Sequence, residues 1–176
     1  MSERLVLPVL LRGWDDAAER LDRRLKGLGD AEYLEEPVRG AWTVRRGDDG
    51  TWTADWADPD PDPAPVTTIA WRLWHLASDA LGGYLERSPG GRPLQVTGTG
   101  WHGDAASALR DLATAVAAFR GAITDLGEEG IWRPLGPAWG PFATASWADL
   151  LVHATDEFAH HGAEIALLRD LHRWRD

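Results

Sequence analysis

The fold is decided by one stretch near the C-terminus, which reads Ser146-Trp-Ala-Asp-Leu-Leu-Val-His153-Ala-Thr-Asp-Glu157-Phe-Ala-His160-His161-Gly-Ala-Glu164-Ile-Ala-Leu-Leu-Arg169. Apolar residues recur along it at helical spacing, so one side of a single long helix should face a core. Ser146 is a good N-cap, and Asp149 completes a capping-box pattern three residues later. The apolar positions are Leu150, Leu151, Ala154, Phe158, Ile165 and Leu168. We expect this helix to end near Trp174.

Two histidines and a glutamate form a polar stripe along the same helix. His153, Glu157 and His161 are each four residues apart, so their side chains stack with a drift of only about 40° per step. Imidazoles and a carboxylate beside an apolar face are costly to bury unless something satisfies them, and a divalent metal would do so. Glu157 and His161 have the spacing by which one helix supplies two ligands to one ion. The third ligand should come from another helix, and His75 is the obvious candidate.

Other readings of these residues stay open. His153 could replace His75 as a ligand, hydrogen-bond to a ligand, or be an ordinary hydrogen-bonded histidine, and we favour the hydrogen bond to a ligand. The stripe could also be only a buried hydrogen-bond network. His160 is about 100° round the helix from His161, which favours a polar contact to a neighbouring helix.

Three more residues are candidates for supporting roles. Asp79 and Glu164 could orient ligand imidazoles, although surface salt bridges explain both equally well. Asp79 is also, with His153, a candidate catalytic base. Trp71 lies one turn before His75 and is the best candidate for an aromatic pocket wall that excludes water and holds an apolar substrate.

The rest of the chain predicts further helices and one long excursion, residues 37–66, over one end of the bundle. Apolar periodicity predicts helices over about 5–28, 67–87 and 104–126, with a short helical turn at 30–33 and Gly127 as the stop of the third. Alternating β-formers at 41–45 and 51–56 flank turn chemistry at 46–50, which favours a small β-hairpin. Residues 58–65 read as an extended Pro-rich connector, 88–102 as a loop and 128–145 as irregular structure.

Four amphipathic helices predict an all-α four-helix bundle in which residues 1–176 form a single domain. The excursion between the first two helices is rich in tryptophan, which favours packing over disorder. It is also long enough to cross the bundle, so the topology need not be up-down-up-down.

Composition excludes several functions. The 176 residues contain no cysteine, so the chain has no disulfide, thiolate ligand or cysteine nucleophile. A net charge of -10 argues against binding nucleic acid. No apolar run approaches the roughly 20 residues of a membrane span, and no leader is apparent, so we expect a soluble cytoplasmic protein. The abundance of Ala, Gly, Asp and Arg suggests a GC-rich bacterial genome.

The sequence resembles the DinB-like family of metalloenzymes. The resemblance rests on Gly27-Leu-Gly-Asp-Ala-Glu-Tyr-Leu, Thr67-Thr-Ile-Ala-Trp-Arg-Leu-Trp-His75-Leu-Ala, Trp132-Arg-Pro-Leu-Gly-Pro and, most specifically, Asp156-Glu-Phe-Ala-His-His161-Gly-Ala-Glu-Ile-Ala-Leu-Leu-Arg. Many relatives have three histidine ligands, whereas here Glu157 stands where the first histidine of the last-helix pair would be. That departure resembles the mycothiol-dependent maleylpyruvate isomerases, whose N-terminal domain shares this bundle.

The resemblance implies that His75, Glu157 and His161 bind a metal that activates the thiol of a small cosubstrate for transfer or isomerisation. Two histidines and one carboxylate leave a coordination position open, as a catalytic zinc site requires. Zinc is favoured, but nickel, iron or manganese could use the same ligands. Because the chain lacks cysteine, a thiol such as mycothiol must arrive from outside. Relatives often form homodimers. The alternative is a bundle that binds a metal or small molecule without turnover, or a stress-response protein.

Overall fold

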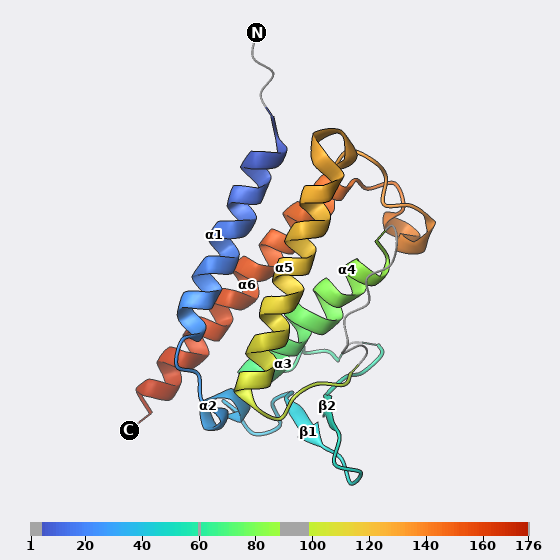
Figure 1. Cartoon of the computed structure of the whole chain (residues 1–176). Coiled ribbons are helices and arrows are strands. Elements are labelled where there is room, and N and C mark those ends of the chain that lie inside the picture. The colour runs from blue at the N-terminus through green and yellow to red at the C-terminus, as the bar shows by residue number, and fades with distance from the viewer. Residues whose placement is uncertain (1–4, 60, 89–98, 176) are drawn as a thin grey trace.

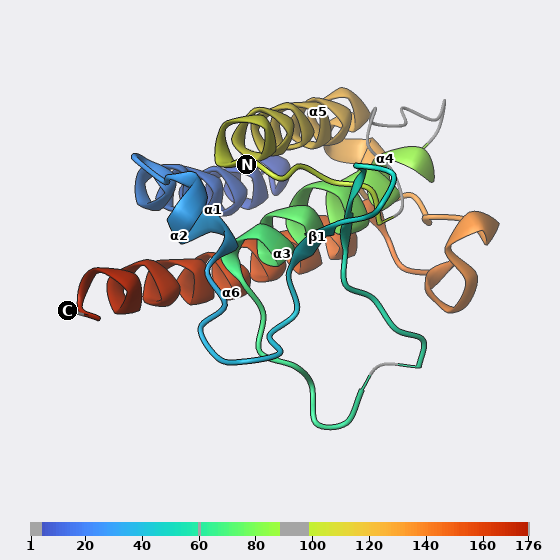
Figure 2. The same ribbon diagram turned by 90° about the horizontal axis from the view of Figure 1, so that it is seen from below.

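The computed structural model describes residues 5–59, 61–88 and 99–175. It is mainly helical, with one small antiparallel sheet. Seen from below, α1 and α5 form one layer and α3 and α6 the other, and the excursion projects from the second layer (Figures 1 and 2). The elements in chain order are α1 (Leu7–Leu25), α2 (Asp30–Leu34), β1 (Val44–Arg46), β2 (Trp52–Ala54), α3 (Ile69–Trp74), η1 (His75–Gly82), α4 (Gly83–Glu86), α5 (Ala105–Gly130), η2 (Pro137–Phe142) and α6 (Trp147–Arg173).

The expected capping box starts α6. The Ser146 side chain accepts a hydrogen bond from the Asp149 backbone N–H, and the Asp149 carboxylate accepts one from the Ser146 backbone N–H. This arrangement satisfies backbone donors that a helix start leaves without partners. The apolar face of α6 packs mainly along α1. The predicted N-terminus of this helix is therefore confirmed, and its end lies one residue before Trp174.

The first helix is shorter than the sequence predicts, spanning Leu7–Leu25 rather than 5–28. The Glu128 carboxylate, which follows the break in α5, accepts hydrogen bonds from the backbone N–H groups of Val6 and Leu7 and so fixes the start. The chain leaves the helix after Leu25 and reaches Gly27, whose φ of +75° favours glycine. In α5, the backbone of Gly127 is non-helical, as expected of a stop.

The second predicted helix is continuous in space but not uniform. Thr68 is its N-cap and accepts a hydrogen bond from the backbone N–H of Trp71. The segment then runs as α3, η1 and α4, and η1 is a π-helix. Such wide turns are rare, and they often occur at functional sites. His75 is the first residue of η1, so the widened turn begins at a candidate ligand.

The hairpin forms with a shorter ladder than the sequence predicts. Val44 pairs with Ala54 and Arg46 with Trp52. Backbone hydrogen bonds link the Trp42 N–H to Val66 and the Thr68 N–H to Trp42, so the excursion is attached to the start of α3. Residues 89–98 of the predicted loop lie outside the described residues. The region 128–145 contains a 3₁₀-helix, η2, that the sequence did not predict.

The core lies between the two layers. Trp14 of α1 is fully buried, and its ring lies 5.1 Å from that of Phe119 in α5 and 4.7 Å from that of Phe158 in α6. Aromatic pairs at these distances contribute beyond the area that they bury. None of the helices in the described part of the chain is long and apolar enough to cross a membrane.

Candidate metal centre

Three side chains that the sequence proposes as ligands meet on one side of the helices. Nε2 of His75 lies 3.1 Å from Oε2 of Glu157, and Nε2 of His161 lies 3.3 Å from the same oxygen. One potential ligand atom from each of the three residues lies within 4.8 Å of the others. The two imidazole rings cross edge to face, with centroids 4.8 Å apart. The widened start of η1 thus presents His75 to two residues that lie one turn apart on α6.

A carboxylate stands behind each imidazole. Nδ1 of His75 lies 2.9 Å from Oδ2 of Asp79, and Nδ1 of His161 lies 2.7 Å from Oε2 of Glu164. A carboxylate accepts hydrogen bonds, so each Nδ1 carries the proton and donates it. Nε2 of each ring is then free of a proton and can bind a metal, as in the carboxylate–histidine–metal triads of metal sites.

This proton arrangement makes the centre a good fit for a cation. With both Nδ1 protons donated outward, neutral imidazoles direct their Nε2 lone pairs at the Glu157 carboxylate, which is unfavourable unless a proton or cation lies between them. A tetrahedral zinc ion with bonds of about 2.0–2.1 Å keeps its ligand atoms about 3.3 Å apart. The observed separations of 3.1 and 3.3 Å are close to that value.

Arg72 is a part of the site that sequence reasoning missed. Its largely buried guanidinium forms an ion pair with Glu164 and also lies 2.8 Å from Nδ1 of His161. A guanidinium only donates, so Nδ1 cannot serve Arg72 while it donates to Glu164, and Glu164 is the shared acceptor. Arg72 precedes His75 by three residues, a spacing that places both on one side of a helix and could have pointed to it.

A second group of potential ligands, His160, His161 and Glu164, also has atoms within 4.8 Å of one another. The Arg72 guanidinium already pairs with Glu164 there, so a divalent cation would meet a positive charge at this group. Within the described residues, the group formed by His75, Glu157 and His161 is therefore the better metal site.

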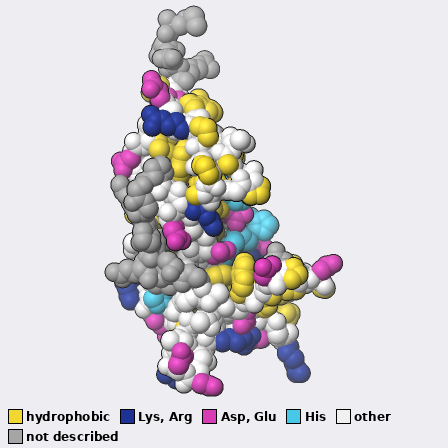
Figure 3. Space-filling model, turned by 90° about the vertical axis from the view of Figure 1, so that its right-hand side faces the viewer, with side chains coloured by type: hydrophobic (Ala, Val, Ile, Leu, Met, Phe, Trp, Pro, Cys, Tyr) yellow, Lys and Arg dark blue, Asp and Glu magenta, His cyan; other side chains and the backbone are white. Residues whose placement is uncertain are grey.

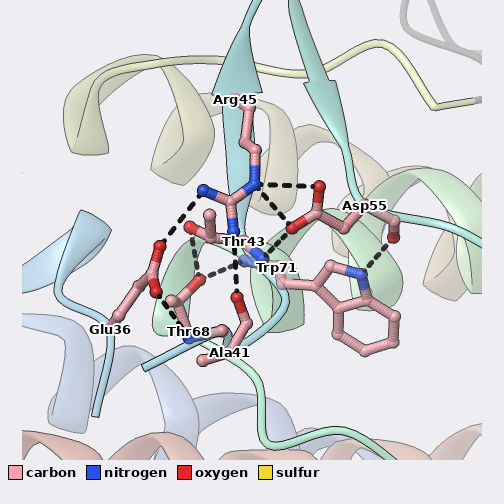
Figure 4. A network of polar contacts seen from close by, with 8 residues as sticks. Glu36, Ala41, Thr43, Arg45, Asp55, Thr68 and Trp71 are labelled. Carbon is pink, nitrogen blue, oxygen red and sulfur yellow. Dashed lines mark hydrogen bonds and ion pairs between the residues drawn. The ribbon is translucent and has the colours of Figure 1, made fainter. Parts of the chain in front are cut away.

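Trp71 lies flat against His75. The two rings are 5.3 Å apart between centroids and inclined by 9°, so the indole covers one face of the imidazole. The indole N–H donates to the backbone carbonyl of Asp55 at 2.8 Å. Figure 4 shows Arg45 between the carboxylates of Glu36 and Asp55, with Trp71 beside Asp55. The excursion thus fixes Trp71, and Trp71 in turn limits the rotation of the His75 ring.

His153 and His160 do not belong to this group, although the ring of His160 crosses that of His161 edge to face, with centroids 4.8 Å apart. The His153 ring is 6.2 Å from that of Tyr84, and the two line one pocket. In the described structure, His153 contacts neither His75 nor His161. His160 lies 3.3 Å from Glu164. The predicted contact of His160 with a neighbouring helix is wrong, because Glu164 is on the same helix.

The electrostatics of the centre favour one charged and one neutral imidazole. Burial opposes charge on His75, but hydrogen bonds to Asp79 and Glu157 outweigh it and raise the pKa of His75 above its ordinary value. Burial lowers the pKa of His161 despite Glu164, and the charges on His75 and Arg72 lower it further. Burial alone would raise the pKa of Glu157, but the neighbouring histidines hold that pKa below its ordinary value.

The centre is shielded but accessible. The exposed fractions of the side chains are 20% for His75, 22% for Glu157 and 14% for His161. Histidine side chains reach the surface beside acidic ones on the face that Figure 3 shows. A small molecule can therefore approach the three residues from solvent.

We expect Asp79→Ala to weaken divalent metal binding by about tenfold, because residues that orient histidine ligands typically affect metal affinity to that extent. His75 would lose the acceptor that fixes its tautomer. Competition titrations with a chromophoric chelator would measure the affinity, and Asp156→Ala, an exposed carboxylate on α6, is the matched control. An unchanged affinity for Asp79→Ala would show that this hydrogen bond does not support a ligand.

Metal affinity should fall as the pH falls. His75 must lose its Nε2 proton to bind a metal, and Asp79 and Glu157 raise its pKa, so protons compete with the metal at a higher pH than they would at an ordinary histidine. We expect the affinity to fall by about tenfold per pH unit below that pKa, with further loss once His161 is protonated. Calorimetric titrations in buffers of different ionisation enthalpy would measure both the affinity and the protons released. A flat profile between about pH 8 and 6 would contradict a histidine-based site.

Comparison with known protein families places the chain in one of them. A model of the DinB superfamily matches residues 14–165, a range that includes His75, Glu157 and His161. The chain therefore belongs to the DinB superfamily. Comparisons with curated proteins and with solved structures find no match.

Proposed function

We propose that this protein is a metal-dependent enzyme of the DinB class, built as a single four-helix-bundle domain over residues 1–176. It uses a low-molecular-weight thiol to transfer a group to, or isomerise, a small electrophile. The observation that carries the proposal is the convergence of His75, Glu157 and His161, each histidine with a carboxylate behind it. Zinc suits these ligands best, and nickel, iron or manganese could take its place.

Each residue has a role in this proposal. His75, Glu157 and His161 hold the ion, which when bound supplies the Lewis acidity that makes a thiol or a water more acidic near neutral pH. Asp79 and Glu164 keep the proton on Nδ1 of each histidine, so that Nε2 faces the ion. Trp71 excludes water from one face of His75. Since the chain has no cysteine, the thiol belongs to a cosubstrate, and mycothiol is a candidate.

A turnover screen tests the proposal. The protein would be stripped with a chelator, reloaded separately with zinc, nickel, iron(II) or manganese(II), and assayed with several low-molecular-weight thiols, including mycothiol, and several small electrophiles. We expect product formation to require both a metal and a thiol and to stop when the chelator is added. Turnover that persists in the stripped protein would contradict the proposal. Tight metal binding without turnover for any pair would favour a non-catalytic metal-binding protein instead.

A further inference from the structure

A pocket of about 600 Å³ lies between the end of α4, η2 and the first turns of α6. Its size is typical of small-molecule sites, which span about 300–1,000 Å³. Trp139 of η2 forms one wall. Its ring lies 5.8 Å from that of Tyr84 and 5.9 Å from that of Trp147. Trp139 therefore packs η2 against both α4 and α6. We call this cavity the Trp139 pocket.

The Trp139 pocket combines apolar walls with one cation. Leu135, Phe142 and Leu150 line it together with Trp139. The Arg87 guanidinium lies 5.6 Å from the centre of the Trp139 ring, and its hydrogen bond within the described structure is a long one of 3.4 Å to the carbonyl of Gly83.

The carboxylates of the described structure leave Arg87 available. Within the described residues, no carboxylate forms an ion pair with Arg87. The acid that lines the pocket, Asp149, is occupied by the capping box, where its carboxylate accepts from the backbone N–H of Ser146 at 2.8 Å and from its hydroxyl at 2.7 Å. In a chain with a net charge of -10, an arginine over an aromatic wall that has no ion pair among the described residues is a local site for an anion.

His75, Glu157 and His161 do not line the pocket, but two residues on one side of it lie near them. His153 lines the pocket and lies one helical turn before Glu157 on α6. Tyr84 lines it as well, and burial, followed by the negative charges of Glu157 and Asp79, raises the pKa of its phenol. Tyr84 therefore keeps its proton at neutral pH and can donate a hydrogen bond to a bound molecule.

We propose that the Trp139 pocket is the substrate subsite of the metal centre and that it takes an apolar, planar organic anion. The anionic group pairs with Arg87, the apolar body lies against Trp139 and Phe142, and the other end reaches Tyr84 and His153 beside Glu157. The inference rests on the proposed function for its catalytic meaning, since it names the substrate class of that centre. Binding at the pocket needs only the residues that line it.

A matched pair of probes tests the charge requirement. 2-Naphthoate and 2-naphthamide have the same apolar body, but only the first is an anion. We expect Arg87→Gln to weaken naphthoate binding by about five- to tenfold and to leave naphthamide binding within about twofold, because a charge-assisted contact is lost only for the anion. Arg133 is an exposed arginine of the segment 128–145 that does not line the pocket, so Arg133→Gln should bind both probes as the unchanged protein does. Isothermal titration calorimetry would give the affinities.

Phe142→Ala tests the location. Phe142 is 67% exposed, so its loss should not unfold the protein, and it should weaken both probes alike. Equal naphthoate affinity in the unchanged protein and Arg87→Gln, unchanged affinity of both probes in Phe142→Ala, or no naphthoate binding at all would each overturn the inference.

Repeating the titrations with the chelator-treated protein and with His161→Ala separates this inference from the proposed function. If the pocket is a subsite in its own right, naphthoate still binds when the metal is gone and only turnover is lost. Loss of naphthoate binding together with the metal would overturn the pocket as described, and metal-independent binding with no turnover would overturn the enzyme proposal alone.

Discussion

Replacing Arg169 by alanine is expected to lower the free energy of unfolding by about 3–5 kcal/mol, the usual cost of removing one partner of a buried ion pair. Arg169 is 2% exposed and Glu32 is 8% exposed. Nε and Nη2 of the guanidinium donate to the two oxygens of Glu32 at 2.7 and 3.0 Å, and Nη1 donates to the carbonyls of Arg24 and Lys26. The substitution leaves a buried carboxylate and two carbonyls without these donors.

Urea unfolding followed by circular dichroism would measure the change for Arg169→Ala. The thermal midpoint should fall by roughly 6–20 °C, at about 2–4 °C per kcal/mol for a domain of this size. Arg173→Ala is the matched control, because Arg173 is exposed one turn further along α6, and it should stay within about 0.5 kcal/mol. A loss below about 1 kcal/mol for Arg169→Ala would mean that water or a shift of α2 compensates Glu32.

The sequence predicted the parts of this molecule that depend on local rules. The capping box of Ser146 and Asp149 and the break at Gly127 each depend on a few neighbouring residues. Helical periodicity located the long helices to within a few residues for the same reason. The prediction that Glu157 and His161 act together was also local, since their spacing on one helix places both side chains on one stripe.

Contacts between distant segments were harder to predict. His75 was chosen partly by resemblance to a family, because 82 residues separate it from Glu157 and no periodicity spans that gap. Helical periodicity gave no sign that Arg72 and Arg169 are largely buried, because the carboxylates that pair with them lie on other elements. The π-helical turn at His75 has no pattern in its sequence that we recognise.

The excursion shows how a local prediction can be correct and still miss a role. Alternation and turn residues predicted the hairpin, and tryptophan content predicted packing. Neither indicated that the carbonyl of Asp55 would hold the Trp71 indole, or that Trp71 would lie against His75. Such positioning depends on how the hairpin docks on α3, which is decided by contacts across the fold.

Replacing His161 by alanine is expected to abolish stable metal binding, lowering affinity by more than about 100-fold, because removing a ligand costs more than removing a residue that orients one. The other two ligands would remain, but they lie on different elements and would have to close on the ion alone. Metal content after purification and dialysis, measured by inductively coupled plasma mass spectrometry, should fall from about one ion per chain to a trace. Zinc should then no longer raise the thermal midpoint, since that shift reflects binding to the folded state.

His160→Ala is the matched control for His161→Ala. His160 is the adjacent residue on α6, and its side chain is 61% exposed. It contacts Glu164 and the ring of His161, but it is not one of the three proposed ligands. The His160→Ala protein should keep its metal and the zinc-dependent rise in thermal midpoint. Equal metal loss in both variants would mean that Glu164 and its two histidine neighbours form the site, and metal retained in His161→Ala would remove the role given to His75 and Glu157. The two substitutions differ by one position, so the result depends on which side of α6 faces the ion.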